Sequence, residues 1–185
     1  VKNLTPHLQK TIRDGGQVLF IVPEKTNLEY LAGRLRNKYA VFVIHSGLSD
    51  KEYFKNWSGA ANGQAQIIIG TRQALFLPFK NLRLTIVDDP LNNVYKSDMA
   101  PRYNAPELAK KIAEIHGCKI IFISSAIGVE NYNLIKTGRL ILNDKKNKNR
   151  AKFRVVNTTE ELKENNFSPL SRKLKEVLVS GAKIP

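Results

Sequence analysis

Two adjacent carboxylates, Asp88 and Asp89, directly follow the mostly apolar run Leu84–Val87. This run predicts a buried strand, and Pro90 ends it because proline has no N–H to donate to a sheet. Ligands of open α/β sheets bind outside the carboxyl ends of the strands, where paired acids can hold a cation directly or through water. Paired aspartates after a strand also serve as turn formers or helix caps, so the pair alone does not decide between the two roles.

Aromatic and cationic residues alternate in the segment after this pair. Tyr95 and Lys96 come first, and Arg102 and Tyr103 follow. Rings can stack on bases while cations contact phosphates, so the pattern favours single-stranded nucleic acid as the ligand. The alternative for the tyrosines is structural packing, because a tyrosine ring is often half-buried.

Polar residues also follow two other predicted strands. His45 and Ser46 come after one strand, and Thr71 and Arg72 come after another. Small and hydroxyl residues at such a corner let a phosphate approach the backbone N–H groups, and Arg72 could add a charge-assisted hydrogen bond. A helix N-cap is the equally open role for Thr71.

Apolar periodicity predicts alternating strands and helices. The expected strands cover residues 18–22, 41–44, 67–69, 84–87, 119–123, 139–142 and 153–156. The expected helices cover residues 3–14, 27–35, 49–60, 106–115, 129–135 and 168–179. Asn27 could cap the second helix, Ser49 and Glu52 form a capping box for the third, and Pro169 occupies the first position of the last.

This alternation predicts an α/β fold, with a mostly parallel sheet covered by helices on both faces. Right-handed crossovers place the carboxyl ends of all such strands at one edge of the sheet. We therefore expect that edge to carry the residues that follow the five strands, namely Pro23, His45, Gly70, Asp88 and Ser124.

Composition narrows the class of protein. The 185 residues can build a real core, and a net charge of +14 favours a polyanionic partner, most simply nucleic acid. The single cysteine, Cys118, excludes an intrachain disulfide and, with scattered histidines, a zinc site, so a buried thiol is expected. No apolar run reaches the roughly 18 residues of a membrane span, and a cytoplasmic location without a membrane partner is expected.

The last third differs in composition. Residues 144–152 are basic and rich in asparagine, which is typical of a linker or a solvated loop. The chain has no initiating methionine and stops where a helix is expected to give way to a strand, so we expect a piece of a longer chain.

Several segments together resemble the primosomal protein N′ (PriA) family, the replication-restart DNA helicases of superfamily 2. The segments read HSGLSD at 45–50, IIIGTRQALFLPF at 67–79 and PRYNAPELA at 101–109, with YK at 95–96. Their order along the chain makes the resemblance specific. It implies that residues 1–143 form a RecA-like first helicase lobe, that 144–152 link it to the rest, and that 153–185 begin the second lobe.

The resemblance also implies roles for individual residues. His45, Ser46, Thr71 and Arg72 fall in segments that contact single-stranded DNA in the family. Asp88 falls where the family binds magnesium with ATP. The segments around Tyr95–Lys96 and Arg102–Tyr103 resemble the loop that couples DNA binding to ATP hydrolysis, and Ser125 falls within the family's G-S-A-T segment. DNA, ATP, Mg²⁺ and other replication-restart proteins are the implied partners and cofactors.

The departures from the family pattern concern the nucleotide. The chain contains no G-x-x-x-x-G-K-[ST] phosphate loop, which in a longer chain should lie just before Val1. The family's D-E-E-H reads Asp-Asp-Pro-Leu here, so Asp89 replaces the glutamate that acts on the attacking water. Its side chain is one methylene shorter, and a displacement of about 1 Å can cost on the order of 100-fold in rate. Ile127 replaces the threonine of G-S-A-T.

Three functions remain open on this sequence. The first is an ATP-dependent 3′-to-5′ DNA helicase acting in replication restart, with hydrolysis impaired. The second is a non-catalytic DNA-binding scaffold derived from such a helicase. The third is a metal-dependent small-molecule α/β enzyme using Asp88 and Asp89, which fits the predicted sheet edge but not the positive charge.

Overall fold

The computed structural model describes residues 4–143 and 155–179. The chain forms two compact units, Val1–Leu140 and Ile141–Pro185. No helix in the described ranges is long and apolar enough to cross a membrane. The assignment of the units to two helicase lobes stays a prediction.

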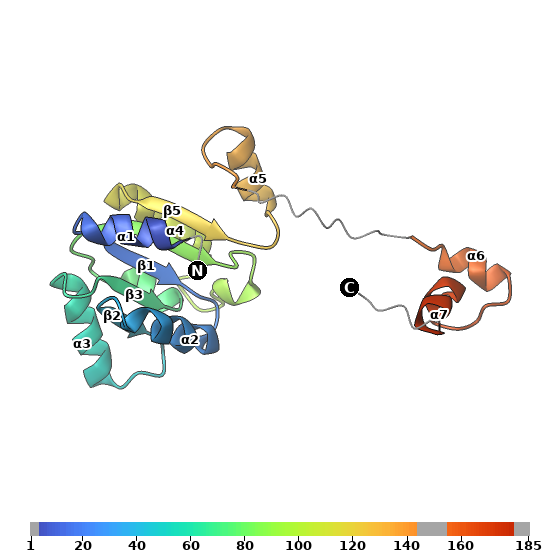
Figure 1. Ribbon diagram of the computed structural model, residues 1–185, viewed down its shortest axis with the longest axis horizontal. Helices are drawn as coiled ribbons and strands as arrows, with labels where there is room; N and C mark the ends of the chain where they lie inside the picture. The colour runs from blue at the N-terminus through green and yellow to red at the C-terminus, as the bar shows by residue number, and fades with distance from the viewer. Residues whose placement is uncertain (1–3, 144–154, 180–185) are drawn as a thin grey trace. The chain divides into compact units, whose positions relative to one another are not determined.

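The first unit is built on a five-stranded sheet in which every pairing is parallel. Its strands are β1 (Gln17–Ile21), β2 (Val41–Ile44), β3 (Ile67–Gly70), β4 (Leu82–Asp88) and β5 (Lys119–Ile123), in the order β2-β3-β1-β4-β5. Parallel strands buried on both faces are continuously apolar, as β3 and residues 18–21 of β1 are. The predicted α/β class and parallel sheet are confirmed (Figure 1).

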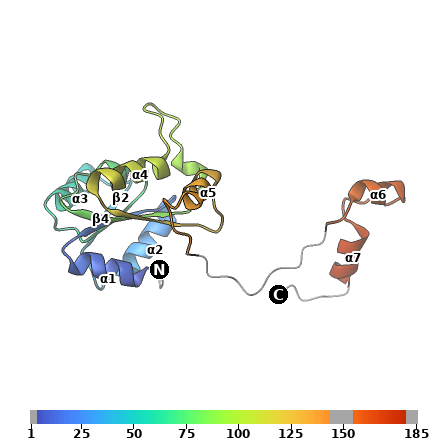
Figure 2. The same ribbon diagram turned by 90° about the horizontal axis from the view of Figure 1, so that it is seen from above.

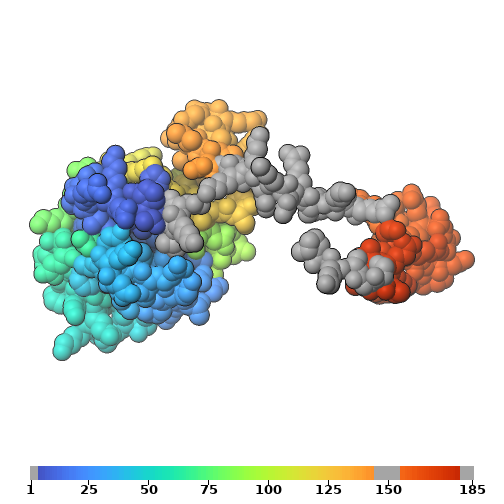
Figure 3. All heavy atoms as spheres, in the orientation of Figure 1, coloured from blue at the N-terminus to red at the C-terminus, as the bar shows by residue number. Residues whose placement is uncertain are grey.

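Helices cover both faces of this sheet. They are α1 (Thr5–Arg13), α2 (Lys25–Arg36), α3 (Asp50–Ala61) and α4 (Ala105–His116). A further helix, α5 (Val129–Lys136), follows β5 and has no buried residue. Figure 2 shows α1 and α2 below the sheet and α3 and α4 above it, and Figure 3 shows α1 and α2 as neighbours on their face. Alternate residues of β1 serve the two layers: Val18 and Phe20 pack with α1 and α2, whereas Leu19 and Ile21 pack with α3 and α4.

Two predicted helix ends are confirmed in detail. Ser49 and Glu52 form the expected capping box at the start of α3, with the Ser49 hydroxyl 2.6 Å from Glu52 Oε2. This hydrogen bond lowers the pKa of the Glu52 carboxyl. Gly117 ends α4 in the left-handed conformation, with φ of 57°. The local sequence therefore sets where these helices start and stop.

A buried glutamine joins the amino end of β1 to two neighbouring segments. Gln17 Nε2 donates to the carbonyls of Ala60 and Ala65, each at 3.0 Å, and Gln17 Oε1 accepts from the Asn81 N–H at 3.0 Å. Only 3% of Gln17 is exposed, yet its amide is fully used. The amide thus satisfies backbone groups that lie between elements and outside any ladder.

Some sequence expectations were wrong. Asn27 lies inside α2, which begins after Glu24. Residues 139–142 form no strand, because the chain turns there with the Arg139 and Leu140 N–H groups donating to Leu134. Of the strand expected at 153–156, residues 153–154 lie outside the described residues, and 155–156 are not in a strand.

The second unit contains two short helices, α6 (Thr158–Lys163) and α7 (Arg172–Val179). The sequence did not predict α6, and α7 begins at Arg172 instead of near Pro169. Ser171 caps this helix, because its hydroxyl accepts the Leu174 N–H at 3.1 Å, and the Glu161 carboxylate accepts the Arg172 N–H at 3.0 Å.

Replacing Gln17 with leucine should destabilise the first unit. The Ala65 carbonyl and the Asn81 N–H would lose their partner, whereas the Ala60 carbonyl still accepts the Gly63 N–H. At about 1–3 kcal/mol for each buried unsatisfied group, we expect a loss of about 2–6 kcal/mol in the free energy of unfolding. Urea unfolding followed by the fluorescence of Trp57, the single tryptophan, measures this loss. Gln9→Leu, at an exposed position of α1, is the matched control and should change stability little. Equal stability of the two variants would contradict the role of the amide.

Candidate nucleic-acid interface

The carboxyl ends of the five strands lie at one edge of the sheet because all pairings are parallel. From β2 to β5 the strands are followed by His45, Thr71, Val22, Asp89 and Ser124. Four strand spacings separate the two ends of this edge, a span of about 19 Å. The expectation of one shared edge is confirmed, and that edge is long enough for several nucleotides in a row.

A compact turn follows β2. His45 Nδ1 accepts the Gly47 N–H at 3.0 Å, which leaves Ser46 exposed at the outside of the turn. The Lys25 ammonium lies over this turn, only 2.7 Å from where a Cβ on Gly47 would stand. Lys25 is a cation of the edge that the sequence did not single out, because it lies at the first position of α2, well before the turn in sequence.

Arg72 serves the backbone of a neighbouring loop. Its Nη1 donates to the carbonyls of Val94 and Lys96, at 3.1 and 2.8 Å. Thr71 precedes the 3₁₀ helix η1 (Arg72–Phe76) and donates its N–H to the Ile44 carbonyl at 3.1 Å, with no side-chain cap recorded for this turn. One guanidinium nitrogen of Arg72 therefore holds the loop in place, and the phosphate contact expected of Arg72 stays a prediction.

Tyr95 also points inward. Its side chain is 1% exposed, and its hydroxyl lies 2.7 Å from the Asp88 carbonyl and 3.4 Å from that of Ile21. Burial, together with the charges of Asp88 and Asp89, raises the pKa of the phenol. The expectation that Tyr95 stacks on a base is wrong for this conformation, since no face of the ring is open.

The exposed aromatic and cationic groups lie on the loop between Lys96 and Asn104. A β-bridge joins those two residues, and the Ser97 N–H donates to the Tyr103 carbonyl at 2.9 Å. Figure 2 shows this loop before α4 projecting away from the sheet. Lys96 and Arg102 are exposed on it, so the loop presents two cations to the solvent.

A second ring accompanies Tyr103. The Phe76 ring meets it edge to face with centroids 5.4 Å apart, and Phe76 is 58% exposed. An exposed phenylalanine at the end of η1 is a signal that sequence reasoning could have used. The two rings offer a stacking surface, and Arg102 directly precedes Tyr103 in the sequence.

The two aspartates differ in their surroundings. Asp88 is partly buried, and burial together with the charge of Asp89 raises the pKa of its carboxyl. Asp89 adopts φ of 45°, donates its N–H to the Ile123 carbonyl at 2.8 Å, and accepts from Asn92 Nδ2 on its Oδ2 at 3.1 Å. The Asp89 carboxylate is thus engaged locally, whereas Asp88 forms no ion pair within residues 4–143 and 155–179.

Asp88 could supply one of the several ligands that a magnesium ion needs. Within residues 4–143 and 155–179, no group of three His, Cys, Asp or Glu side chains could hold a metal by itself. Magnesium in nucleotide sites needs just one or two carboxylates, with phosphate and water supplying the other ligands. The donor set at Asp88 therefore fits a magnesium ion brought by a nucleotide, and not a resident metal.

The turn after β5 completes the edge. Ser124 Oγ accepts the Ala126 N–H at 3.3 Å, and Ser125 is exposed. Gly128 lies against Leu91, since a Cβ there would stand 2.7 Å from Leu91 Cδ2. The segments that follow β4 and β5 are therefore in contact, which places Ser125 near the aspartates in the fold but shows no coupling role.

Cys118 lies away from this edge. Its Sγ is 3.4 Å from Thr85 Oγ1, and burial raises the pKa of the thiol. A partly buried, protonated thiol agrees with the packing role expected from the sequence.

The chain is similar in sequence to replication restart proteins. No protein-family model matches it. It is 31% identical over 186 residues to the replication restart protein PriA of Bacillus subtilis, which covers 94% of this chain and 23% of that protein. The PriA proteins of Thermotoga maritima and Haemophilus influenzae are 35% and 29% identical, over 68% and 96% of this chain. The chain spans about a quarter or less of the length of each.

Solved helicase structures have lower sequence identity to this chain than these PriA proteins have. The C-terminal domain of the DEAD-box protein Dbp5 aligns with 66% of this chain and 67% of its own at 18% identity, with a TM-score of 0.47. The DUF1998 helicase MrfA aligns with 71% of this chain and 23% of its own at 17% identity, also with a TM-score of 0.47. At that level neither structure bears on the function of this chain.

Asp88→Asn should stabilise the first unit at neutral pH. The folded state raises the pKa of this carboxyl, so ionised Asp88 opposes folding once the pH exceeds its unfolded value, about 3.9. The gain from Asp88→Asn should therefore be full at pH 7 and vanish below that value. Urea unfolding across this pH range tests it, with Asp98→Asn on the exposed loop as the control. Lower stability of Asp88→Asn at pH 7 would contradict the assignment.

Proposed function

Because this chain belongs to the PriA family of replication-restart helicases, we propose that it binds single-stranded or forked DNA along the carboxyl edge of its sheet, while its ATP hydrolysis is impaired or lost. The observation that supports this most is a contrast between the two ends of the segment after β4, one exposed to solvent and one engaged in a local hydrogen bond. The Lys96–Asn104 loop presents cations and a ring pair, whereas Asp89 is engaged with Asn92. The proposed parent activity is ATP-dependent unwinding from 3′ to 5′ in replication restart.

The proposed DNA surface combines three features of the edge. Lys25 and the exposed Ser46 lie at the β2 end, and the rings of Phe76 and Tyr103 lie at the loop with Arg102. Cations attract the phosphates and rings accept stacked bases, so sequence preference should be small. In this proposal His45 and Thr71 contribute through their turns, and Arg72 and Tyr95 hold the loop in position.

Impaired hydrolysis is proposed from the geometry at Asp89. Its left-handed φ and its hydrogen bond to Asn92 direct the carboxylate into the local turn. An aspartate also reaches less far than the glutamate in the D-E-E-H of the family. Leu91 lies where that motif has histidine, and it packs against Gly128 instead of offering an imidazole.

A bound nucleotide would engage few residues of this chain. Asp88 would hold magnesium through the nucleotide, and magnesium would supply charge neutralisation for phosphate transfer. Burial and repulsion from Asp89 both disfavour the ionised form of Asp88, so a bound cation would stabilise that form. Ser125, exposed after β5, is the proposed position through which nucleotide binding would be sensed.

The runner-up is a DNA-binding scaffold with no turnover, recruiting other replication-restart proteins. It shares the DNA surface and differs only at the Asp88–Asp89 pair. The metal-dependent small-molecule enzyme has less support, because it does not account for the net charge of +14.

Lys96→Ala and Arg102→Ala should each weaken binding of single-stranded DNA without changing sequence preference. A lost phosphate contact makes the slope of log K against log salt shallower by about 0.7 for a single strand. Fluorescence anisotropy with labelled dT oligonucleotides at several salt concentrations measures the slope. Lys10→Ala, near the end of α1 and the opposite edge of the sheet, is the control and should leave it unchanged. An unchanged slope in both loop variants would remove the loop from the DNA surface.

Asp89→Glu should raise DNA-stimulated ATP turnover of the full-length protein. Restoring the longer side chain moves the carboxylate by about 1 Å, and such a displacement is worth on the order of 100-fold in rate. Turnover with magnesium and forked DNA measures the change, and Asp98→Glu on the loop is the control. Fast DNA-stimulated hydrolysis by the unaltered protein would contradict impairment. No turnover in either form, with DNA binding intact, would favour the scaffold.

A further inference from the structure

The amino edge of the sheet, opposite the proposed DNA surface, carries an excess of exposed cations. It is formed by the segments that lead into or begin the five strands, which are residues 13–16, 37–40, 62–66, 79–83 and 116–119. Among their side chains are five lysines and arginines and one carboxylate, Asp14. We call the five the amino-edge cations; all are exposed, and they are Arg13, Lys38, Lys80, Arg83 and Lys119.

The amino-edge cations are not neutralised by neighbouring carboxylates. None of the five forms an ion pair within residues 4–143 and 155–179. Two exposed cations on helices do have such partners, since Arg36 pairs with Glu29 at 3.6 Å and Lys111 with Glu114 at 2.9 Å. Like charges along one edge repel each other, so a polyanion bound there would stabilise the folded chain.

An irregularity in the sheet displays Arg83 at this edge. Leu82 pairs with Gln17 and Leu84 pairs with Val18, so Arg83 is an extra residue of β4 with no partner of its own on β1. Such bulges re-aim a side chain, and they recur next to active sites. Arg83 is accordingly exposed although Leu82 and Leu84 on either side of it are buried.

The Arg83 guanidinium is held from one side only. Its Nε donates to Asn81 Oδ1 at 2.9 Å, and Asn81 Nδ2 in turn donates to the Gly15 carbonyl at 3.0 Å. The Arg83 side chain also lies against Gly16, where an added Cβ would stand 2.7 Å from Arg83 Cβ. Within residues 4–143 and 155–179 its two Nη nitrogens have no hydrogen-bond partner. A planar fork positioned in this way is ready to donate to a phosphate.

A second cation lies close to Arg83 at the start of β5. Burial raises the pKa of the Cys118 thiol and the charge of Arg83 opposes that shift, so Arg83 is near the residue that precedes Lys119. Leu84, which follows Arg83, pairs with Lys119 in the sheet. Arg83 and Lys119 are therefore neighbours across the two strands.

The cations extend over the whole amino edge. Lys38 precedes β2 and Lys119 begins β5, and the four strand spacings between these two strands span about 19 Å. Between them, Lys80 lies over Gly63, where an added Cβ would stand 2.8 Å from Lys80 Cδ. Each strand of a duplex carries one phosphate per about 3.4 Å of its axis, so the row matches about five or six base pairs.

The amino edge has no exposed aromatic ring. Within its five segments, all of which the structure describes, Phe79 is buried and Tyr39 is partly buried against the core. Sites for single strands combine cations with rings on which unpaired bases stack. The bases of a duplex are already stacked on each other, and its phosphates need only cations. The amino edge therefore suits the backbone of a duplex.

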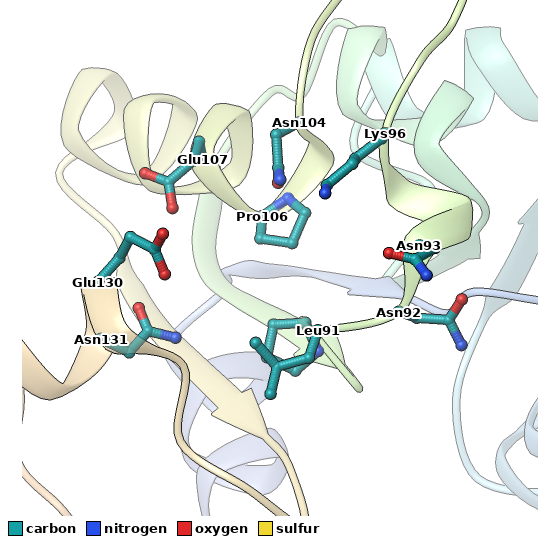
Figure 4. A pocket seen from close by; sticks show the side chains of 10 residues that line it. Leu91, Asn92, Asn93, Lys96, Asn104, Pro106, Glu107, Glu130 and Asn131 are labelled. Atoms are coloured by element: carbon teal, nitrogen blue, oxygen red, sulfur yellow. The ribbon is translucent and has the colours of Figure 1, made fainter.

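The carboxyl edge, by contrast, carries charges of both signs. Where the segment after β4 meets α4 and α5, Figure 4 shows Glu107 and Glu130 on one side of a hollow and Lys96 on the other. Glu107 pairs with Lys110, but Glu130 forms no ion pair within the described ranges. Phosphates that continued past Lys96 would be repelled by Glu130, so a second backbone is held better at the amino edge.

We propose that the amino edge binds the phosphate backbone of the duplex arm of a forked DNA, with Arg83 as the anchor. The inference rests on the proposed function and deepens it, because the single strand would contact one edge and the paired arm the other. β1, with its five residues, separates the two edges by about 16 Å. The contact should have no sequence preference, since it reaches phosphates and no base edges.

Salt titrations of the full-length protein with three labelled DNAs test this inference. The DNAs are a dT oligonucleotide, a blunt duplex and a fork that combines a duplex arm with a dT strand. Arg83→Gln and Lys119→Gln should each make the slope of log K against log salt shallower by about 0.9 with the duplex and the fork, as for one phosphate contact on B-form DNA. The slope with dT should stay unchanged.

Lys55→Gln is the matched control, because Lys55 is an exposed cation in the middle of α3 and belongs to neither edge. It should leave all three slopes unchanged. Arg83→Gln also removes the hydrogen bond to Asn81, and urea unfolding shows whether this variant is still folded. Lys119→Gln removes an exposed charge without such a bond and decides the test if Arg83→Gln is unstable.

The remaining outcomes separate this inference from the proposed function. Unchanged duplex slopes in both variants would overturn the inference and leave the amino-edge cations as a solvated rim, while single-strand binding by the Lys96–Asn104 loop would stand. An equal loss of slope with dT would overturn the choice of a duplex, because the amino edge would then hold single strands. Binding of none of the three DNAs would remove the proposed function and this inference together.

Discussion

The hydrogen bond from the buried Tyr95 hydroxyl to the Asp88 carbonyl is the constraint on which the functional edge depends. It connects the segment after β4 to the last residue of β4, and the longer contact with Ile21 adds the end of β1. Because the ring is in the core, the loop cannot shift without exposing it or leaving a carbonyl unpaired. The position of the exposed loop residues is therefore set by a residue that is itself hidden.

Arg72 extends this constraint to β3. By donating to two loop carbonyls, it ties the turn after β3 to the same segment, so three neighbouring strands hold one loop. The Arg72 Nη1 atom used in this way fixes the position of the loop residues. The exposed Lys96 and Arg102 and the half-buried Tyr103 thereby gain a defined place, held by two residues that resemble ligands in the sequence.

The sequence could predict the sheet and its carboxyl edge, because both follow from the periodicity of apolar residues and from the order of strands and helices along the chain. Continuous apolar runs such as β3 leave no choice but burial on both faces, and alternation with helices makes the strands parallel. It could not predict which way Tyr95 and Arg72 point, because an aromatic or cationic residue suits both a ligand and a backbone carbonyl.

The two ends of the segment after β4 are stabilised by different contacts, and this allows them to change separately. The turn at Asp89 is satisfied by Ile123 and Asn92 without any nucleotide. The loop is held by the hydrogen bonds of Arg72 to the Val94 carbonyl and of the Tyr95 hydroxyl to the Asp88 carbonyl, and neither bond involves the carboxylate of Asp89. Replacing the catalytic glutamate of the family therefore costs the loop nothing in hydrogen bonds. A lobe built in this way can lose hydrolysis while it keeps the surface that we propose for DNA.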